Sequence, residues 1–376
     1  MLAMSAPLDL GGDARSKRGA IVGTDVMYSL RPLTARIVRP LDAGGFWRGA
    51  ETVDIDPAGR VERAPALFLP DELDRIVAHY PGVAPKDDLD RLLHTSRIEP
   101  ATTAQVVPDV IVADGTLLRH GGVQVIRPGP GKRKMLRGHF ATLPEAMLCA
   151  DYVIDRYFGH WVADGWSREQ LAIERAMVPM VLDPARFGHS EGYRALFDLP
   201  ARSIADTRVR RLWLIDDRGY NPARMERFRR VRARLRAAVA GRGGGDKVFI
   251  RRGAQAAGRN LCNEAEVIAA LSARGFTIIA PDTLPVAQIA GALRDARIVV
   301  GVEGSALAHA NAVLDPGACV FAIQSPASFN TIHRLATADV GLRFAFSVGD
   351  VATGDDFTMP VARLLRAIDM VEAAMR

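Results

Sequence analysis

The sequence predicts an α/β protein of two domains. At 376 residues the chain is longer than one ordinary compact domain and suits two of moderate size. Its content of 48% hydrophobic and 24% charged residues is that of a core-forming globular protein, which excludes a disordered or fibrous chain. From residue 247 onward, short strand patterns alternate with helix patterns, which indicates a parallel sheet covered by helices on both faces.

The first half of the chain predicts a mixture of strands, loops and helices. Residues 1–20 have the composition of a flexible lead and contain no apolar run of signal-peptide length. Residues 21–100 alternate short apolar stretches with Pro, Gly and Asp, which indicates strands and loops with one short helix near residues 72–79. Residues 106–127 predict two or three strands with tight glycine turns, and the apolar spacing of residues 143–180 is mostly helical.

A strand and an arginine-rich helix follow. Residues 209–216 have the pattern of a buried strand, and a helix is predicted over residues 222–240 because Asn221 can cap it and a proline occupies its first position. The glycine-rich run at residues 241–245 ends this helix, so we place the domain boundary within residues 217–246. The helix carries seven arginines against one acid: Arg224, Arg227, Arg229, Arg230, Arg232, Arg234 and Arg236, with Glu226.

The clearest pattern covers the last third of the chain. Right-handed crossovers between parallel strands would make residues 247–360 a Rossmann-like domain, and a last amphipathic helix is expected over residues 361–376. The expected elements are strand 247–251, helix 264–274 with Gly275 just past its end, strand 276–280, helix 286–294, strand 297–302, helix 305–313 and strand 318–323.

Three arginines follow the first strand of this region. Ligands bind at the carboxyl ends of the strands in an open parallel sheet, and Arg251, Arg252 and Arg259 come directly after such an end. Their guanidinium groups can surround a diphosphate through paired N–H donors. A solvated basic loop explains the same three residues, and spacing alone leaves both interpretations open.

A glycine turn follows the strand at residues 297–302. The helix that begins near Ser305 offers free backbone N–H groups and the positive end of its dipole, which favour an anion. Gly304 and Ser305 are small enough for a phosphate or a sugar to approach the backbone. Glu303 can accept hydrogen bonds from a ribose or sugar diol, or act as a base. An ordinary strand-to-helix turn is the alternative.

A histidine and an aspartate stand four residues apart in the first half. If the chain is helical from Gly159 onward, His160 and Asp164 share one face. A carboxylate in that position can fix the imidazole tautomer and raise its basicity, which suits a general base. A helix-terminal histidine packed beside Trp161 explains the same pattern without catalysis.

Two further polar patterns have structural explanations. Asn263 and Glu266 predict a capping box at the start of the helix 264–274. Asp54 and Asp56 fall in the irregular N-terminal region, and we discount this pair as a metal site. No metal site and no cofactor are therefore expected.

Cysteine usage and hydropathy favour a cytoplasmic protein. Cys149, Cys262 and Cys319 lie in apolar surroundings without metal-binding spacing, which predicts buried free thiols. No window approaches the ~20 apolar residues of a membrane span. The net charge of +6 points to an anionic partner, such as a nucleotide diphosphate or a lipid surface, so a peripheral contact with the inner membrane is an additional hypothesis.

Taken together, these residues resemble the family 61 glycosyltransferases, a group with bacterial capsule and lipopolysaccharide enzymes and eukaryotic xylosyl- and N-acetylglucosaminyltransferases. The resemblance covers about residues 150–325. It rests on YFGHWVADGW, on VFIRRGAQAAGRNLCNEAEV with its strand-end arginines and Asn-Glu, and on VGVEGSALAHANAVLDPG. Glu303 stands where many members have His, and His309 stands where they have Asn. Some bacterial relatives share the Glu-Gly-Ser form, so these differences indicate a subfamily.

The resemblance implies two Rossmann-like domains facing a cleft (the GT-B arrangement), inversion at the anomeric carbon and no required metal. Residues 247–360 would bind a nucleotide-sugar donor. A surface glycan or lipid-linked glycan acceptor would enter from residues 21–216. In this hypothesis His160, oriented by Asp164, removes the proton of the attacking hydroxyl, and Glu303 is the rival base.

Two other functions fit parts of the same sequence. A nucleotide-sugar epimerase can share the two-domain architecture, and it would need no acceptor. A non-catalytic protein could bind an anionic surface through the arginine-rich helix 222–240, although a solvated helix explains that composition too. The chain carries no known nucleic-acid motif, so we expect no nucleic-acid partner.

Overall fold

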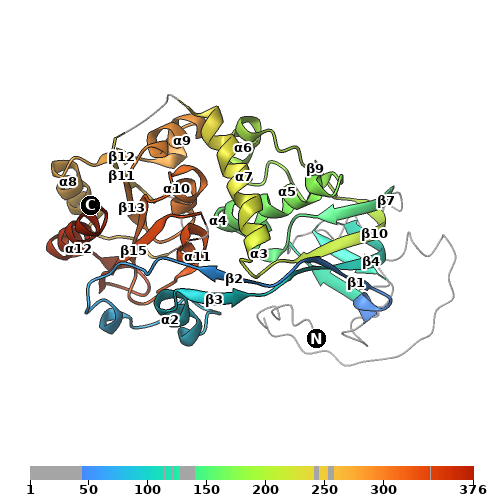
Figure 1. Cartoon of the computed structure of the whole chain (residues 1–376), viewed down its shortest axis with the longest axis horizontal. Coiled ribbons are helices and arrows are strands. Elements are labelled where there is room, and N and C mark those ends of the chain that lie inside the picture. Colours follow the sequence, from blue (N-terminus) through green and yellow to red (C-terminus); the bar gives the residue numbers. More distant parts are fainter. Residues whose placement is uncertain are drawn as a thin grey trace.

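The fold is mixed α/β, with two main sheets on either side of a long helix (Figure 1). The computed structural model describes residues 45–113, 115–119, 122–127, 140–240, 245–252, 258–338 and 340–376. The lead predicted for residues 1–20 and most of the glycine-rich linker lie outside these described residues. The predicted α/β class is therefore confirmed.

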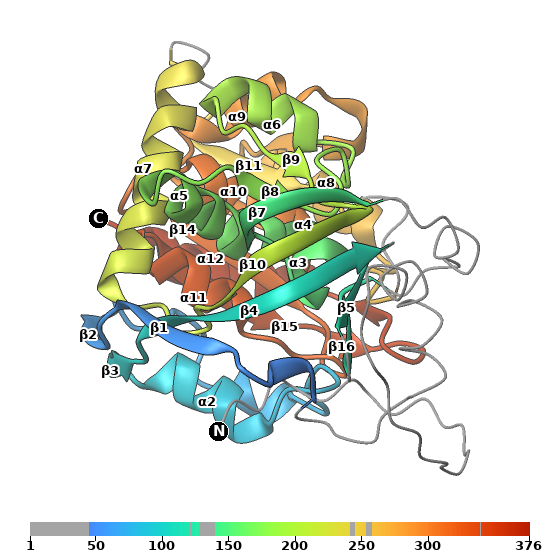
Figure 2. The same cartoon turned by 90° about the vertical axis from the view of Figure 1, so that its right-hand side faces the viewer.

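The first sheet combines antiparallel and parallel strands. Its order is β6-β5-β4-β10-β7-β8-β9, with β1 paired to β4, and Figure 2 shows β4, β10 and β7 side by side. The pairs from β10 through β7 and β8 to β9 are parallel, whereas β10 pairs antiparallel with β4. Its strands are β1 (Glu51–Asp56), β4 (Thr102–Ala113), β5 (Thr116–Arg119), β6 (Gly122–Val125), β7 (Ala141–Leu148), β8 (Pro179–Val181), β9 (Arg202–Ser203) and β10 (Thr207–Asp216).

The region predicted to be mostly helical begins and ends in strands. Residues 141–148 form β7, whose last three residues, Ala146, Met147 and Leu148, are all buried because both faces of the strand are covered. A short, continuous apolar run of this kind does not distinguish a buried strand from a helix. The helices of this region are α3 (Tyr152–Arg156), α4 (Phe158–His160), a π-helical turn (Trp161–Gly165), α5 (Trp166–Glu174) and, farther along, α6 (Ser190–Phe197).

The second sheet is entirely parallel, with the order β12-β11-β13-β14-β15. The predicted strands and helices of this region are confirmed, and α11 and β15 follow them. Helices α8 and α12 cover one face, while α9 and α10 cover the face toward the rest of the chain (Figure 1). The elements are β11 (Lys247–Ile250), α8 (Glu264–Ala273), β12 (Thr277–Ile279), α9 (Val286–Arg294), β13 (Ile298–Val302), α10 (Ala308–Val313), β14 (Cys319–Gln324), α11 (Ile332–Ala338), β15 (Arg343–Val348) and α12 (Val361–Ala374).

The strand order creates a topological switch point between β11 and β13. From β11 the chain first adds β12 on one side, and then returns to place β13, β14 and β15 on the other. Loops at the carboxyl ends of the two strands at such a point diverge and leave a crevice, which is where open parallel sheets bind ligands. The segments that follow β11 and β13 are those with the arginines and the glycine turn.

Helix α7 (Pro222–Ala238) stands between the two sheets (yellow in Figure 1). The Asn221 side chain accepts a hydrogen bond from the N–H of Arg224, so the predicted cap is confirmed. The interpretation of α7 as a solvated basic helix is wrong, because Arg224, Arg227 and Arg232 are buried. Their partners are internal, and they include Asp164 for Arg224, Asp56 for Arg227 and the carbonyl of Leu314 for Arg232.

Residues 64–93, here named the N-terminal arm, leave the first sheet and lie along the second. Leu67 pairs with β15 through hydrogen bonds of 2.9 and 3.2 Å to the backbones of Phe344 and Phe346. The predicted helix at residues 72–79 is wrong apart from a 3₁₀ turn at Leu73–Arg75, and the helix of the arm is α2 (Pro85–Leu93). The reason is Glu72, whose buried carboxylate accepts hydrogen bonds from the second sheet and fixes the segment there.

Two smaller predictions are also corrected. Cys262 is exposed, whereas Cys149 and Cys319 are buried as expected. Asn263 makes no capping bond: it accepts a hydrogen bond from the N–H of Met359 and donates one to the carbonyl of that residue, so it joins α8 to the segment before α12. Within the described residues, no helix is both long and apolar enough to cross a membrane.

Candidate active site

His160 and Asp164 are in direct contact. The Nδ1 atom of His160 lies 2.6 Å from Oδ2 of Asp164. The turn between them, Trp161–Gly165, has π-helical hydrogen bonding, with the N–H of Trp166 bonded to the carbonyl of Trp161. Such turns are rare and occur frequently at functional sites. The sequence-based expectation that the two side chains share a face is confirmed; their catalytic role stays a prediction.

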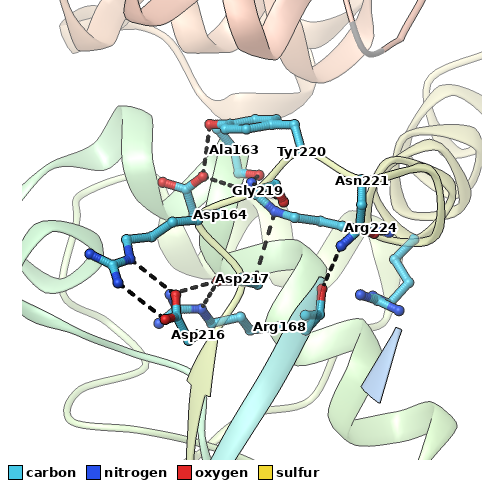
Figure 3. Close-up of polar contacts among 12 residues, drawn as sticks. Ala163, Asp164, Arg168, Asp216, Asp217, Gly219, Tyr220, Asn221 and Arg224 are labelled. Carbon is cyan, nitrogen blue, oxygen red and sulfur yellow. Dashed lines mark hydrogen bonds and ion pairs between the residues drawn. The ribbon is translucent and has the colours of Figure 1, made fainter. Parts of the chain in front are cut away.

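The second oxygen of Asp164 is held from the start of α7. The guanidinium of Arg224 and the hydroxyl of Tyr220, at 3.0 Å, both donate to Oδ1 (Figure 3). Burial raises the pKa of Asp164, but the charge of Arg224 and the hydrogen bond from His160 outweigh burial and hold that pKa far below the usual range. Asp164 is therefore ionised, and it accepts hydrogen bonds from His160, Arg224 and the hydroxyl of Tyr220.

The aspartate in turn determines the protonation of His160. Burial lowers the pKa of His160, but the hydrogen bond and the charge of Asp164 outweigh burial and raise the pKa above the ordinary histidine value. Because an ionised carboxylate can only accept, Nδ1 of His160 carries the hydrogen in this pair. In the neutral ring, Nε2 is then the basic nitrogen.

The three strand-end arginines do not form one cluster. Arg251 is exposed and donates to Glu264 of α8 at 2.7 Å, so its side chain is directed toward α8. Arg252 donates to the carbonyl of Arg259 at 2.9 Å, and a Cβ added to Gly304 would lie 3.7 Å from the Arg252 guanidinium. Arg252 and Arg259 thus meet at the switch point, beside Gly304.

Glu303 is buried beneath Arg259. Its carboxylate forms an ion pair with that guanidinium, and its other oxygen lies 3.9 Å from Nε2 of His333. Arg259 adopts a left-handed backbone conformation with φ of 54°. Such strain costs on the order of 1–3 kcal/mol and clusters at functional sites. Glu303 therefore neutralises and orients Arg259, whereas no carboxylate among the described residues forms an ion pair with Arg252.

The glycine turn is fixed by a histidine that sequence reasoning missed. Asn311 donates to Nδ1 of His333 at 3.2 Å, and Nε2 of His333 donates to the carbonyl of Gly304 at 2.9 Å. Burial lowers the pKa of His333, so this ring is neutral and keeps its tautomer. Gly304 has φ of 145°, a conformation that is essentially restricted to glycine. No sequence pattern connects His333 to this turn, because 29 residues separate them.

Helix α4 packs directly on the glycine turn. A Cβ added to Gly159 would lie 3.5 Å from Oγ of Ser305 and 3.6 Å from its Cα. The residue before His160 therefore contacts the residue after Gly304. The structure brings together the His160–Asp164 pair from the first half of the chain and the turn after β13 from the second.

Two tyrosines that the sequence analysis did not single out border the same region. Tyr80, from the N-terminal arm, lies under the Arg259 guanidinium, 5.2 Å from its Cζ atom to the ring centroid. Tyr157 lies 6.0 Å from the His160 ring, and its hydroxyl is hydrogen-bonded with that of Tyr80. Burial and the bond with Tyr80 raise the pKa of Tyr157, so the Tyr157 hydroxyl is neutral.

His309 belongs to the core and does not reach this region. Its Nδ1 atom accepts a hydrogen bond from the Tyr193 hydroxyl at 2.7 Å, and Phe158 packs on its ring at 4.7 Å. Burial and the neighbouring His189 lower the pKa of His309 to about 3. His309 is therefore a neutral hydrogen-bond acceptor inside the core.

The described residues contain no group of three His, Cys, Asp or Glu side chains arranged to hold a metal ion. Asp56, one of the two aspartates weighed as a metal site, pairs with Arg227 at 2.6 Å.

The comparison with known families agrees with this geometry. No curated protein matches the chain. Residues 158–321 match the model of the family described as Glycosyltransferase 61, and the matched segment begins at α4 and ends in β14, so it contains both the His160–Asp164 pair and the glycine turn. That match identifies residues 158–321 as a glycosyltransferase region of family 61.

Proposed function

We propose that this glycosyltransferase moves a sugar from a nucleotide-sugar donor to a hydroxyl of a surface-glycan acceptor, with inversion and without a metal ion. One observation carries the proposal: the packing of Gly159 on Ser305 joins a basic imidazole to a turn suited to an anion. Transfer needs both at one place, because a hydroxyl must lose its proton while a diphosphate leaves with two electrons.

The donor diphosphate would lie at the switch point between β11 and β13. Arg252 supports this assignment because it lies beside Gly304 and, among the described residues, pairs with no carboxylate. Burial and the charge of Arg259 lower the pKa of Arg252, and a bound anion would relieve both effects. Arg259, Gly304 and Ser305 would complete the phosphate site. Arg251 could contribute to phosphate binding only if its ion pair with Glu264 broke.

His160 would be the general base. The acceptor oxygen attacks the anomeric carbon, the bond from that carbon to the diphosphate oxygen breaks, and Nε2 of His160 takes the hydroxyl proton. Attack on the face opposite the leaving group inverts the anomeric centre. Glu303 is the weaker candidate, because the residue is 3% exposed and its carboxylate is paired with Arg259.

The remaining details belong to the same proposal. We propose that the second sheet is a Rossmann-like donor domain over residues 247–360, and that residues 21–216 form the acceptor side in a GT-B-like arrangement. The N-terminal arm would then be shared between the two. An acceptor linked to a lipid of the inner membrane fits a cytoplasmic enzyme of capsule or lipopolysaccharide synthesis. Because the buried arginines of α7 have internal partners, a membrane contact would need another basic surface.

Replacement of the base tests the mechanism. We expect His160→Ala to lower the transfer rate by roughly 100-fold or more, because general-base catalysis contributes at least that much. His94→Ala is the control, since His94 is exposed directly after the arm and, among the described residues, its side chain bonds and pairs with Asp90. Sugar transfer would be measured by product analysis with a donor panel. A His160→Ala rate within about tenfold of the parent would remove His160 from the mechanism.

A further inference from the structure

Arg224 is an unusual partner for a catalytic carboxylate because water does not reach it. Its side chain is 2% exposed, and the ring of Tyr220 covers it, with the guanidinium carbon 3.8 Å from the ring centroid (Figure 3). Its Nη1 and Nη2 groups also donate to the carbonyls of Gly219 and Ala163. A buried guanidinium with these fixed contacts acts on Asp164 without screening by solvent.

The positive and negative charges around Asp164 do not balance. Arg168 donates to Asp217 at 2.7 and 2.8 Å and pairs with Asp151 at 3.0 Å, and Arg224 is 3.7 Å from the other oxygen of Asp217. Two guanidinium groups thus face three carboxylates, counting Asp164. One negative charge is left over, and a proton on His160 would balance it.

Asp164 and Arg224 therefore affect the protonation of His160 in opposite directions. The Asp164 carboxylate favours the protonated imidazole, whereas the Arg224 cation opposes it and competes for the same carboxylate. Without Arg224, His160 would bind the proton taken from an acceptor too tightly. Without Asp164, His160 would be too weak a base to take that proton.

We propose that Arg224 is a positioning residue that moderates the basicity of His160 by holding Asp164 ionised and partly neutralised. This inference rests on the proposed function of His160 as the base. Because its side chain is buried and paired with Asp164, Arg224 would act through that carboxylate.

Helix α7 connects this role to the donor side. Two turns and more along the helix, Arg232 donates to the carbonyl of Leu314 and Arg236 to that of Val313, at the end of α10. Helix α10 follows the glycine turn at Gly304. The same rigid element therefore holds Asp164 at its start and the helix of the proposed donor turn toward its end.

The test combines histidine titration by NMR with pH profiles of kcat/KM. In Arg224→Met, and in Arg224→Gln, which keeps an N–H donor toward Asp164, we expect the His160 pKa to rise by roughly one unit, because an opposing cation is removed. Arg224→Lys should return it toward the parent value. Arg229→Met, on the exposed side of α7, is the control and should leave the His160 titration unchanged.

The outcomes separate the two claims. A raised His160 pKa in the uncharged variants, rescued by lysine and matched by the acid limb of kcat/KM, supports the inference. An unchanged His160 pKa in folded Arg224→Met and Arg224→Gln overturns it. If the NMR titration moves while the acid limb of kcat/KM does not, the role of Arg224 stands and the assignment of His160 as the base falls.

Discussion

His160 and Asp164 come from adjacent helical turns, and the contact between their side chains prepares the imidazole to act as a base. The Asp164 carboxylate accepts a hydrogen bond from Nδ1 of the ring, and it is itself held by Arg224 and Tyr220. A free histidine is a weak and freely rotating base near neutral pH. In this setting the ring has one tautomer, one orientation and a higher proton affinity.

Replacement of Asp164 tests this dependence through pH. In Asp164→Asn, the two largest interactions that raise the His160 pKa are lost, and burial, which lowers it, remains. The acid limb of kcat/KM should therefore move to lower pH, while the maximal rate falls by about 100-fold or more because the ring loses its tautomer. The measurement is a pH–rate series from about pH 5 to pH 9, with circular dichroism to establish folding. An acid limb at the parental position would contradict the pairing.

His309 makes a separate prediction about stability. Its pKa is about 3 in the folded chain because of burial, whereas an unfolded histidine has a value near 6.5. Below the unfolded value the unfolded state binds a proton that the folded state refuses. Stability from this group is thus complete above about pH 6.5 and is lost as the pH falls, by about 1.4 kcal/mol per unit.

His309→Asn should flatten that loss, since an amide oxygen can still accept from Tyr193 without titrating. Urea unfolding of parent and variant between about pH 4 and pH 7 measures the difference in slope. Parallel free-energy curves for the two proteins would show that His309 is not buried in its neutral form.

At the scale of elements, the turn between β13 and α10 combines strain with contacts from three sides. Gly304 has φ of 145°, His333 holds its carbonyl, Arg252 lies beside it and α4 packs on Ser305. A turn held in this way is preorganised for an anion, because its backbone does not have to rearrange on binding.

Gly304→Ala should weaken both the fold and donor use. The added Cβ has room, at 3.7 Å from Arg252, so the cost comes from the backbone and is about 1–3 kcal/mol. If the turn shifts to relieve this strain, the KM for the donor rises. Gly275→Ala is the matched control: it also has positive φ and open space, but it lies past the end of α8. Equal kinetic effects in both variants would mean that the turn at Gly304 has no special role.

Elements with strong periodicity were predictable from the sequence, and those set by distant partners were not. The glycines and β-branched strands of residues 247–323 act locally, and the strands and helices predicted from them are confirmed. The arm was mispredicted because Glu72 depends on Ser347 and Val348, 275 and 276 residues away. The capping box failed for a similar reason, since Asn263 finds Met359.

The candidate site divides in the same way. The His160–Asp164 contact follows from helical spacing, and the glycine turn follows from its place after a strand. Their neighbours Arg224, Tyr80 and His333 could not be found, because each reaches the site from another part of the chain. Spacing also grouped Arg251 with Arg252, although consecutive residues leave a strand in opposite directions.

At the scale of the whole molecule, the two sheets are joined by more than a linker. One hydrophobic core includes buried residues from both sheets, the N-terminal arm pairs with β15, and α7 is fixed at both ends. A rigid connection of this kind suits a reaction in which a base on one side and a leaving group on the other must be held in register.

The most direct test of the proposal is a thermal-shift titration with UDP, GDP, CMP, dTDP and their common sugars, with and without EDTA. A ligand at about 100 times its dissociation constant adds about 2.7 kcal/mol of stability. Arg252→Met and Arg274→Met would be compared, since Arg274 pairs with Asp369 on an exposed surface. We predict that one nucleotide raises the midpoint of the parent and of Arg274→Met, but not of Arg252→Met. A shift that needs a metal ion, or no shift with any nucleotide, would contradict a metal-free donor site at the β11–β13 switch point.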